Sequence, residues 1–463
     1  MSAPDVLTRM FVAKDFKGKG LAFTRLPAII RPNGCQRTAP KTGKFAESRQ
    51  IGVDLMVLKQ PTPQVKYVDL DQMIGIADRG EAWVSNLRDD LLEPWPRKQP
   101  PMVTASRLAK LCKVERARIQ YLVTKGNAKG EYPTGSTSGN NRHREFTIED
   151  VQTFVRRAGP YSRRPEDGRA VAIAVGNFKG GVGKTTLSVA LAQGLTLRGH
   201  KVLLVDLDPQ ASSTTLMGYV PTAEIGEAQT VMPFIYGDEP NLDYSIVESY
   251  WPNLHLIPAS PVLFGADYYL PAKQSRDPNY EYWAVLEQAM PRLREQYDVV
   301  VFDTPPSLAY LATNCFMSSD ALVIPLPPET LDFVSSTAFF RQFADLFSGL
   351  RRNREVEKRF EFIKIFLSKV RPRVQSTSVV SSWIQEAYPE MLGRAELFES
   401  DVVKKASTEF KTVYDLDPRD YEGSMQLLNR TLDAFDDMID EVQEQLEGIW
   451  SVQKAAKEVA HGE

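Results

Sequence analysis

The sequence predicts an α/β protein with a mostly parallel sheet covered by helices on both faces, preceded by a small helical domain. Three observations support this fold class. Short apolar runs alternate with longer amphipathic stretches from residue 170 onward, a glycine-rich loop follows the first run, and a basic segment of helical periodicity occupies residues 96–158. Such alternation is typical of a parallel sheet buried between two layers of helices.

The expected strands are near-continuous apolar runs, as strands buried on both faces require. They are Val171–Val175, Val202–Asp206, Leu254–Pro258, Val299–Asp303, Leu322–Pro325 and Phe362–Leu367. A helix is expected from about Thr185 to Leu197. A longer amphipathic helix is expected over residues 421–447, and its apolar stripe is assigned to the core.

Composition and patterning divide the chain into six segments. Residues 1–66 are basic and rich in Pro, Gly, Lys and Thr, which predicts disorder. Residues 67–95 predict a helix whose apolar stripe packs either on a second copy of the chain or on the neighbouring domain. The other boundaries place a small helical domain at 96–158, a linker at 159–169, the α/β domain at 170–450 and a tail at 451–463.

Composition excludes several classes of protein. The 463 residues are 43% hydrophobic and 25% charged, which is ordinary for a soluble globular protein. Three widely spaced cysteines, Cys35, Cys112 and Cys315, exclude a disulfide framework and CxxC metal spacing. No apolar run is long enough to span a membrane, and no signal peptide is evident. We therefore expect a cytoplasmic protein without a membrane partner.

The distribution of charge is more informative than the net charge of -3. Residues 1–66 carry +8 and residues 97–144 carry +9, whereas residues 145–463 carry -15. A basic front on an acidic body is compatible with a polyanionic partner, and equally with a basic tail beside an ordinary solvated domain.

The strongest motif lies between the first expected strand and the helix after it. It includes Lys179, Gly180, Gly181, Val182, Gly183, Lys184, Thr185 and Thr186. A glycine-rich loop in this context turns backbone N–H groups toward phosphate oxygens, and the helix N-terminus adds positive potential. We expect Lys184 to reach the β- and γ-phosphates and the Thr185 hydroxyl to bind Mg²⁺, which predicts ATP and Mg²⁺ as ligands.

This P-loop departs from the plain pattern, because Phe178 replaces a glycine and a second lysine, Lys179, precedes the paired glycines. The next expected strand ends in Asp206-Leu-Asp208-Pro-Gln, and a later one ends in Asp303-Thr-Pro-Pro. Together these motifs resemble the ParA/MinD class of deviant Walker ATPases.

The resemblance implies a role for each charged residue. The family dimerises around two ATP molecules, and Lys179 matches the signature lysine that reaches the partner's phosphates. Asp208 matches the aspartate that orients the attacking water, and Asp303 the one that supports Mg²⁺. Asp206 is expected to support Mg²⁺ indirectly. With charge supplied by Lys179, Lys184 and Mg²⁺ and no other evident base, hydrolysis should be slow.

The front domain distinguishes among branches of this class. Residues 104–114 and 115–122 have the spacing of a helix-turn-helix, and residues 142–150 resemble the end of a winged domain; a plain basic helical hairpin is the alternative. Arg116, Arg118 and Gln120 on the second helix suit contacts to base edges. The residues expected on phosphates are Arg107, Lys110, Lys113, Lys125, Arg142 and Arg144.

With this front domain, the chain resembles the large plasmid partition ParA proteins, including RepA of repABC plasmids, over about residues 67–450. The resemblance implies a homodimer that binds DNA through ATP, is stimulated by a ParB-type centromere-binding protein, and represses its own operon from a nucleoid-associated location. Nonspecific DNA contacts are expected from Lys369, Arg371, Arg373, Lys404 and Lys405. The alternative function is a nucleotide-switched transcriptional repressor without a segregation role.

Overall fold

The computed structural model describes residues 69–91, 98–127, 129–138 and 143–461. Its main sheet has eight strands in the order β11-β10-β9-β4-β8-β5-β7-β6, and only the β6–β7 pair is antiparallel. The strands are β4 (Val171–Val175), β5 (Val202–Asp206), β6 (Val247–Glu248), β7 (Leu254–Ile257), β8 (Val299–Asp303), β9 (Ala321–Leu326), β10 (Phe362–Val370) and β11 (Leu392–Phe398). The predicted fold class is confirmed for this body.

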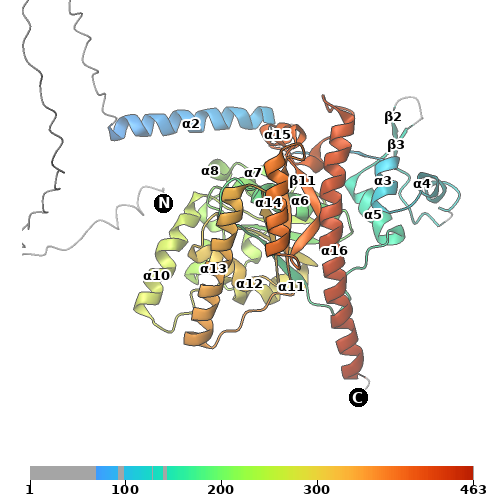
Figure 1. Cartoon of the computed structure of the whole chain (residues 1–463). Helices are drawn as coiled ribbons and strands as arrows, with labels where there is room; N and C mark the ends of the chain where they lie inside the picture. The colour runs from blue at the N-terminus through green and yellow to red at the C-terminus, as the bar shows by residue number, and fades with distance from the viewer. Residues whose placement is uncertain (1–68, 92–97, 128, 139–142, 462–463) are drawn as a thin grey trace, which may run out of the picture. The chain divides into compact units, whose positions relative to one another are not determined.

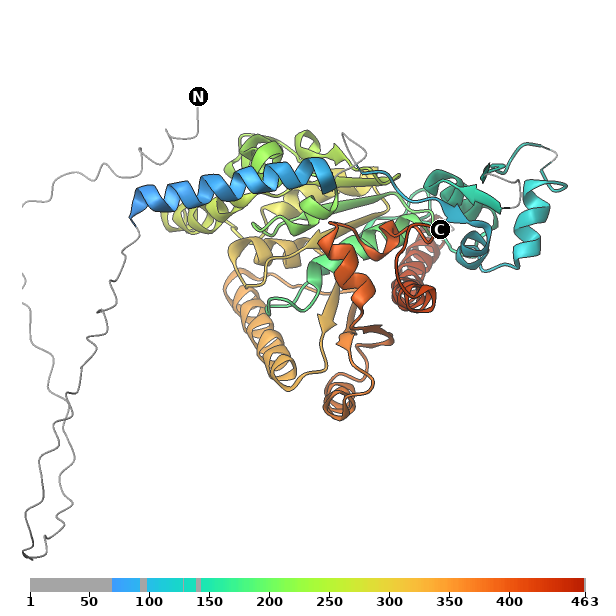
Figure 2. The same cartoon turned by 90° about the horizontal axis from the view of Figure 1, so that it is seen from above.

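Helices lie on both sides of the sheet (Figures 1 and 2). They are α6 (Lys184–Thr196), α7 (Ser212–Leu216), α8 (Pro221–Glu224), α9 (Met232–Tyr236), α10 (Ala266–Arg276), α11 (Met290–Gln296), α12 (Tyr310–Ser318), α13 (Thr330–Arg354), α14 (Gln375–Ala387), α15 (Asp401–Thr408) and α16 (Met425–His461). Alternate residues of β4 belong to two different core clusters: Val171 and Ile173 to one, Ala172 and Ala174 to the other. The period-two alternation of a strand thus supplies an apolar surface to each layer.

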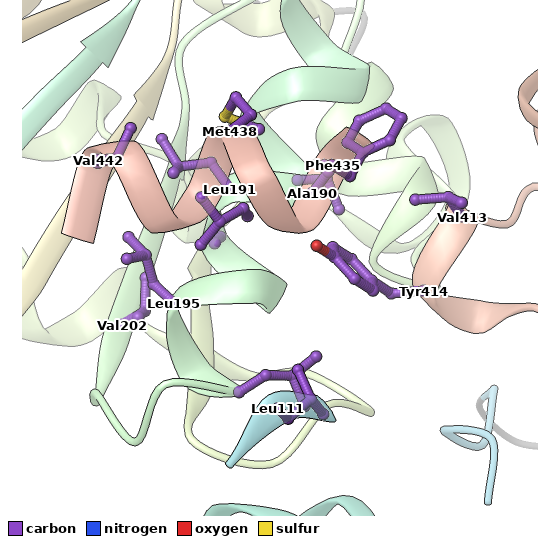
Figure 3. Close-up of a cluster of buried hydrophobic side chains, with 14 of the residues drawn as sticks. Leu111, Ala190, Leu191, Leu195, Val202, Val413, Tyr414, Phe435, Met438 and Val442 are labelled. Carbon is purple, nitrogen blue, oxygen red and sulfur yellow. The ribbon is translucent and has the colours of Figure 1, made fainter. Parts of the chain in front are cut away.

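One of these clusters joins α6, α16 and the front of the chain. Figure 3 shows Leu191 and Leu195 of α6 beside Phe435, Met438 and Val442 of α16, with Tyr414 and Leu111 at the edge of the same group. All are buried. The helix that follows the glycine-rich loop is therefore packed directly against the C-terminal helix.

The C-terminal part of the sheet differs from the prediction. Strand β11 was not expected, because Leu392–Phe398 contains Gly393 and charged Arg394 and Glu396 and lacks a continuous apolar run. Helix α16 runs on to His461, so the boundary predicted at residue 450 falls inside it. Trp450, only 2% exposed, donates through Nε1 to the carbonyl of Arg169 and keeps this later part of the helix against the body.

The described residues between 98 and 158, called the front domain, form a three-stranded antiparallel sheet and three helices. The strands are β1 (Val103–Thr104), β3 (His143–Phe146) and β2 (Ser136–Ser138), in that order across the sheet, and the helices are α3 (Ala105–Leu111), α4 (Arg116–Val123) and α5 (Ile148–Ala158). Thr104 caps α3, and Thr147 forms a capping box with Asp150 at the start of α5. These elements have the arrangement expected of two helices followed by a β-hairpin.

Helix α2 (Leu70–Leu91) covers most of the segment predicted to be helical before the front domain. The large apolar side chains whose burial is described, over residues 70–84, are exposed, with Leu70 at 70% and Met73 at 59%. Residues 1–68, including the segment predicted to be disordered, lie outside the described residues. Within the described ranges, no helix is both long and apolar enough to cross a bilayer.

Candidate functional site

The glycine-rich loop connects the end of β4 to the start of α6, as the sequence predicts. Gly181 and Gly183 have φ angles of +74° and +100°. Side chains with a Cβ rarely adopt this region, so both positions favour glycine. Gly183 caps α6, which places the free N–H groups of the first helical turn at the loop. This geometry suits binding of an anionic group such as phosphate.

Lys184 is the first residue of α6 and lies inside the loop. Its side chain is buried, and Nζ donates a hydrogen bond to the carbonyl of Lys179 at 3.0 Å. Burial lowers the pKa of the Lys184 ammonium, while the carboxylates of Asp303 and Asp208 act in the opposite direction. A cation held with little water around it would gain strongly from an anionic ligand.

Asp206 and Asp303 end neighbouring parallel strands and pair directly in register. Asp303 accepts hydrogen bonds from the hydroxyls of Ser188, at 2.9 Å, and Ser213, at 2.8 Å. Burial raises the pKa of Asp303 to about 6, although these hydroxyls and that of Thr185 lower it. Two carboxyls buried side by side favour a cation nearby.

The Asp206 carboxylate holds the loop that carries Asp208. Its Oδ2 accepts from the backbone N–H and the hydroxyl of Thr214, each at 2.8 Å, and its Oδ1 accepts from the N–H of Asp208 at 3.1 Å. Asp208 accepts from the N–H of Gln210 and lines the cavity beside the loop. Asp206 therefore positions Asp208, a role that its place at a strand end does not reveal.

The site suits Mg²⁺ as a partly hydrated ion. Among the described residues, no group of three or more His, Cys, Asp or Glu side chains could hold a metal alone. The Thr185 hydroxyl instead lies near enough to Asp303 to lower the pKa of that carboxyl. Mg²⁺ commonly uses one or two protein oxygens together with phosphate and water, so the residues present fit this ion.

A cavity of about 610 Å³ opens beside the loop. One wall comes from the loop, Asp208 and Ser212. The other comes from the C-terminal part of the chain and includes Ser368, Lys369, Leu397, Phe398, Glu399, Ser400, Val403, Lys404, Ser407 and Phe435. The sequence did not reveal this second wall, because nothing local in residues 368–435 indicates proximity to the loop.

Lys179 does not point into open solvent in this single chain. Its Nζ lies 2.7 Å from Oδ2 of Asp332, a buried carboxylate in the first turn of α13. Asn177 fixes the backbone here by accepting from the N–H of Lys179 and donating to the carbonyl of Pro325. Neither Asp332 nor Asn177 was predicted to belong to the site.

The basic residues predicted for DNA in the front domain separate into three groups. Arg116, Arg118 and Gln120 are exposed along α4, as base contacts would require. The expectation for Arg107 is corrected, because its guanidinium pairs with Asp436 of α16 and is largely buried. Lys110 and Lys113 pair with Asp433 and Asp440 of the same helix, although each lysine stays about half exposed, and Lys125 is exposed. Arg144 donates to the carbonyl of Thr134 within the hairpin, and Arg142 lies outside the described residues.

The basic residues predicted for DNA on the body are mostly paired with acids. Arg371 contacts Glu329 and Glu399, Lys404 lies 2.8 Å from Glu399, and Lys405 contacts Glu422. Lys369 donates to the carbonyl of Gly181, and both Lys369 and Lys404 line the cavity. This placement favours a role at the cavity for these two lysines. Arg373 is exposed.

The fold and the loop geometry define a P-loop nucleotide-binding protein. Residues 170–352 match the family described as an AAA domain. SopA of Escherichia coli K12 is 31% identical over 291 residues, which span 60% of this chain and 72% of SopA. The chain belongs to the ParA family of P-loop ATPases.

Other relatives extend the similarity into the front of the chain. Plasmid partition protein A of Escherichia coli is 27% identical over 354 residues, or 74% of this chain and 88% of that protein. A putative replication protein A of Sinorhizobium fredii is 26% identical over 353 residues, 73% of this chain and 85% of that protein. A solved structure of a partition protein has the same fold, with a TM-score of 0.53 at 22% identity over 83% of this chain and 100% of that one.

Proposed function

We propose that this chain is a DNA partition ATPase that works as a homodimer, binds DNA and represses its own operon. The observation that carries the proposal is the joint presence, in one chain, of the two-lysine P-loop beside Asp208 and a front domain that exposes Arg116, Arg118 and Gln120 on α4. The names of the relatives support partition as the process. We place the protein in the cytoplasm, associated with the nucleoid.

The loop and its neighbours assign roles in ATP hydrolysis. Backbone N–H groups of Gly180 to Thr186 and the Lys184 ammonium would hold the β- and γ-phosphates, and Asp208 would orient the attacking water. Thr185 and, through water, Asp303 would hold Mg²⁺, which supplies charge neutralisation when bound. Phosphoryl transfer depends on such positioning and electrostatic stabilisation more than on covalent chemistry.

The second wall of the cavity suits the nucleoside. Phe398, Val403 and Phe435 offer apolar surface, while Ser400 and Ser407 offer hydroxyl groups. An apolar cavity with a few polar groups is the usual environment of a small aromatic ligand. We propose that the adenine and ribose lie between the loop and α15.

Hydrolysis should be slow until a partner acts. In the single chain, Lys179 is paired with Asp332. The positive charge expected from the partner's lysine would reach the phosphates only when two chains dimerise. A ParB-type protein would then accelerate turnover. The test is ATP hydrolysis by the purified chain alone, with DNA, and with DNA plus a purified ParB-type protein.

These assays also separate partition from the alternative, a nucleotide-switched repressor without a segregation role. Partition requires that DNA and the ParB-type protein together stimulate hydrolysis, and that Asp208→Ala abolish this stimulation. Unstimulated turnover combined with nucleotide-dependent operator binding would support the repressor alone.

Helix α4 is proposed to read base edges, and Arg118→Ala tests this. The Arg118 side chain is exposed and forms no ion pair among the described residues. Losing one bidentate contact to a base should weaken operator binding by about 1–3 kcal/mol while leaving random-DNA binding largely intact. Filter-binding titrations on the DNA upstream of the operon and on random DNA would measure both affinities.

Arg157→Ala is the matched control, because Arg157 is an exposed arginine on α5 of the same domain. It should change neither affinity appreciably. Equal losses on both DNAs in Arg118→Ala would indicate a single DNA surface, and no loss on either would contradict base reading by α4. For nonspecific binding, Arg373 of the body remains a candidate, whereas Lys369, Arg371, Lys404 and Lys405 are constrained by the contacts described above.

Helix α2 is proposed to pair with α2 of a second copy. Leu70, Met73, Ile74 and Ala77 follow the i, i+3, i+4, i+7 spacing of a helix–helix seam. Ile74→Glu should weaken nucleotide-free dimerisation about tenfold or more, because a buried isoleucine contributes about 1.5–3 kcal/mol. Sedimentation velocity over a range of concentrations measures this. Arg79→Glu on the same helix should leave the dimer intact, and unchanged association in Ile74→Glu would exclude this seam.

A further inference from the structure

Lys98, at the start of the front domain, has an unusual environment for a lysine. It is 4% exposed, and its Nζ contacts four acceptors from distant parts of the chain. These are the carbonyls of Leu216 at 3.0 Å and Phe410 at 2.8 Å, the Tyr250 hydroxyl at 3.2 Å and Oδ2 of Asp415 at 3.0 Å. Burial lowers the pKa of Lys98, and Asp415 opposes this effect.

Two of these acceptors lie at the ends of short helices that line the nucleotide cavity. Leu216 is the last residue of α7, whose first residue, Ser212, lines the cavity a few positions after Asp208. Phe410 lies two residues beyond α15, which lines the cavity through Val403, Lys404 and Ser407. A positive charge at the C-terminal end of a helix is favourable, and here one ammonium serves two such ends.

Another of the four acceptors, Asp415, connects Lys98 to α6, the helix that follows the P-loop. Oδ1 of Asp415 accepts from Nε2 of Gln193 on α6 at 3.2 Å and from the Tyr250 hydroxyl. Asp415 also closes the 3-10 turn η5 (Val413–Asp415) by accepting from the N–H of Thr412. The elements that surround the nucleotide cavity, α6, α7 and α15, therefore meet at one residue of the front domain.

A second buried group supports the same connection. Asp436 of α16 accepts from Arg107 of α3 and from the hydroxyl of Tyr414 at 3.0 Å, and it lies 3.5 Å from Arg198, just beyond α6. Figure 3 shows Leu111 of α3 at the edge of the apolar cluster formed by α6, α16 and Tyr414. Asp436 thus holds α3 of the front domain through Arg107 and, at the same time, contacts Tyr414 and Arg198 of the nucleotide-binding body.

We propose that Lys98 couples the nucleotide site to the front domain. A nucleotide held between the P-loop and α15 shifts α15 or α7, and Lys98 transmits that shift to α3 and α4. The effect on DNA binding rests on the proposed function. By thermodynamic linkage, operator DNA then changes the affinity for nucleotide by the same factor by which nucleotide changes the affinity for operator DNA.

The coupling can be measured without DNA. Hydrogen exchange of residues 103–123 in the full chain would be followed without nucleotide, with ADP and Mg²⁺, and with ATPγS and Mg²⁺. We expect nucleotide to change exchange in α3 and α4 of the wild type. The change should be lost in Lys98→Met and in Asp415→Asn, a nearly isosteric variant that should keep the fold if Lys98→Met does not.

Lys110→Met is the matched control. Lys110 of α3 pairs with Asp433 of α16, so it also joins the front domain to the body, but the pair is about half exposed and should contribute little. Its exchange response should equal that of the wild type. No response to saturating nucleotide in the wild type, or equal responses in all four proteins, would overturn the proposal.

Operator binding separates this proposal from the proposed function. Coupling of typical size predicts at least about a fivefold difference in operator affinity between nucleotide states, falling to about onefold in Lys98→Met. If the wild type binds no operator but its exchange responds to nucleotide through Lys98, the coupling stands and the repressor role fails. If operator binding is tight but neither affinity nor exchange responds to nucleotide, the coupling alone fails.

Discussion

Replacing Lys184 by methionine is expected to weaken ATP binding by about 100-fold or more. The Lys184 ammonium is the side-chain cation buried within the P-loop, and hydrogen bonds between charged groups contribute about 1.5–3 kcal/mol each. Losing contacts to two phosphates therefore removes at least two powers of ten in affinity. Isothermal titration calorimetry with ATP and Mg²⁺ measures the loss, and turnover should disappear with it.

The stability of the same variant distinguishes a functional lysine from a structural one. Burial lowers the pKa of Lys184, so below that lowered pKa the folded chain carries a charge that is better solvated in the unfolded chain. The fold therefore loses stability at these pH values, and the loss fades as pH rises above the folded-state pKa. Lys184→Met removes this penalty and keeps the length of the side chain. We expect an unchanged or higher melting temperature without nucleotide. Near-normal ATP affinity, or a clear loss of stability, would contradict the assignment.

Lys201→Met provides the matched control. Lys201 precedes β5, and its ammonium lies over the ring of Tyr297, away from the residues that line the cavity. Its replacement should leave ATP affinity unchanged.

Local sequence was sufficient for the P-loop and its acids. The loop follows a buried strand and opens a helix, so its glycines and Lys184 were predicted from residues close in the chain. Asp206 and Asp303 were assigned from the resemblance, and each ends an expected strand; the two strands are parallel neighbours in the structure, so the carboxyls meet at one edge of the sheet. The residues of the site that could be predicted are those that belong to a motif of neighbouring residues in the chain.

The roles that depend on contacts distant in sequence were not predicted. Arg107 fits a DNA-contacting pattern, yet its partner is Asp436, 329 residues away. Lys404 is exposed, as a basic surface residue would be, but β11 and α15 also place it at the cavity beside Glu399. Asp332 and Lys98 carry no motif at all, and only the packing of α13, α7 and α15 gives them partners.

The lysine before the glycine pair is expected to act across a dimer. Lys179→Ala should still bind ATP, because Lys184 and the loop N–H groups remain, yet it should not hydrolyse it. Asp208→Ala should also bind ATP without turnover, since Asp208 is the carboxylate placed to orient water in the cavity. Each variant alone is thus expected to be inactive.

Mixing the two inactive variants should restore hydrolysis if Lys179 crosses to its partner. In a mixed dimer, the site on the Lys179→Ala subunit keeps its own Asp208 and receives an intact Lys179 from the Asp208→Ala subunit. If equal amounts of the two variants pair at random in a two-fold dimer, about a quarter of all ATPase sites should be active. Phosphate release over a range of mixing ratios should peak near equal amounts. A mixture that remains inactive although it forms mixed dimers would mean that Lys179 acts within its own chain, where Asp332 already holds it at 2.7 Å.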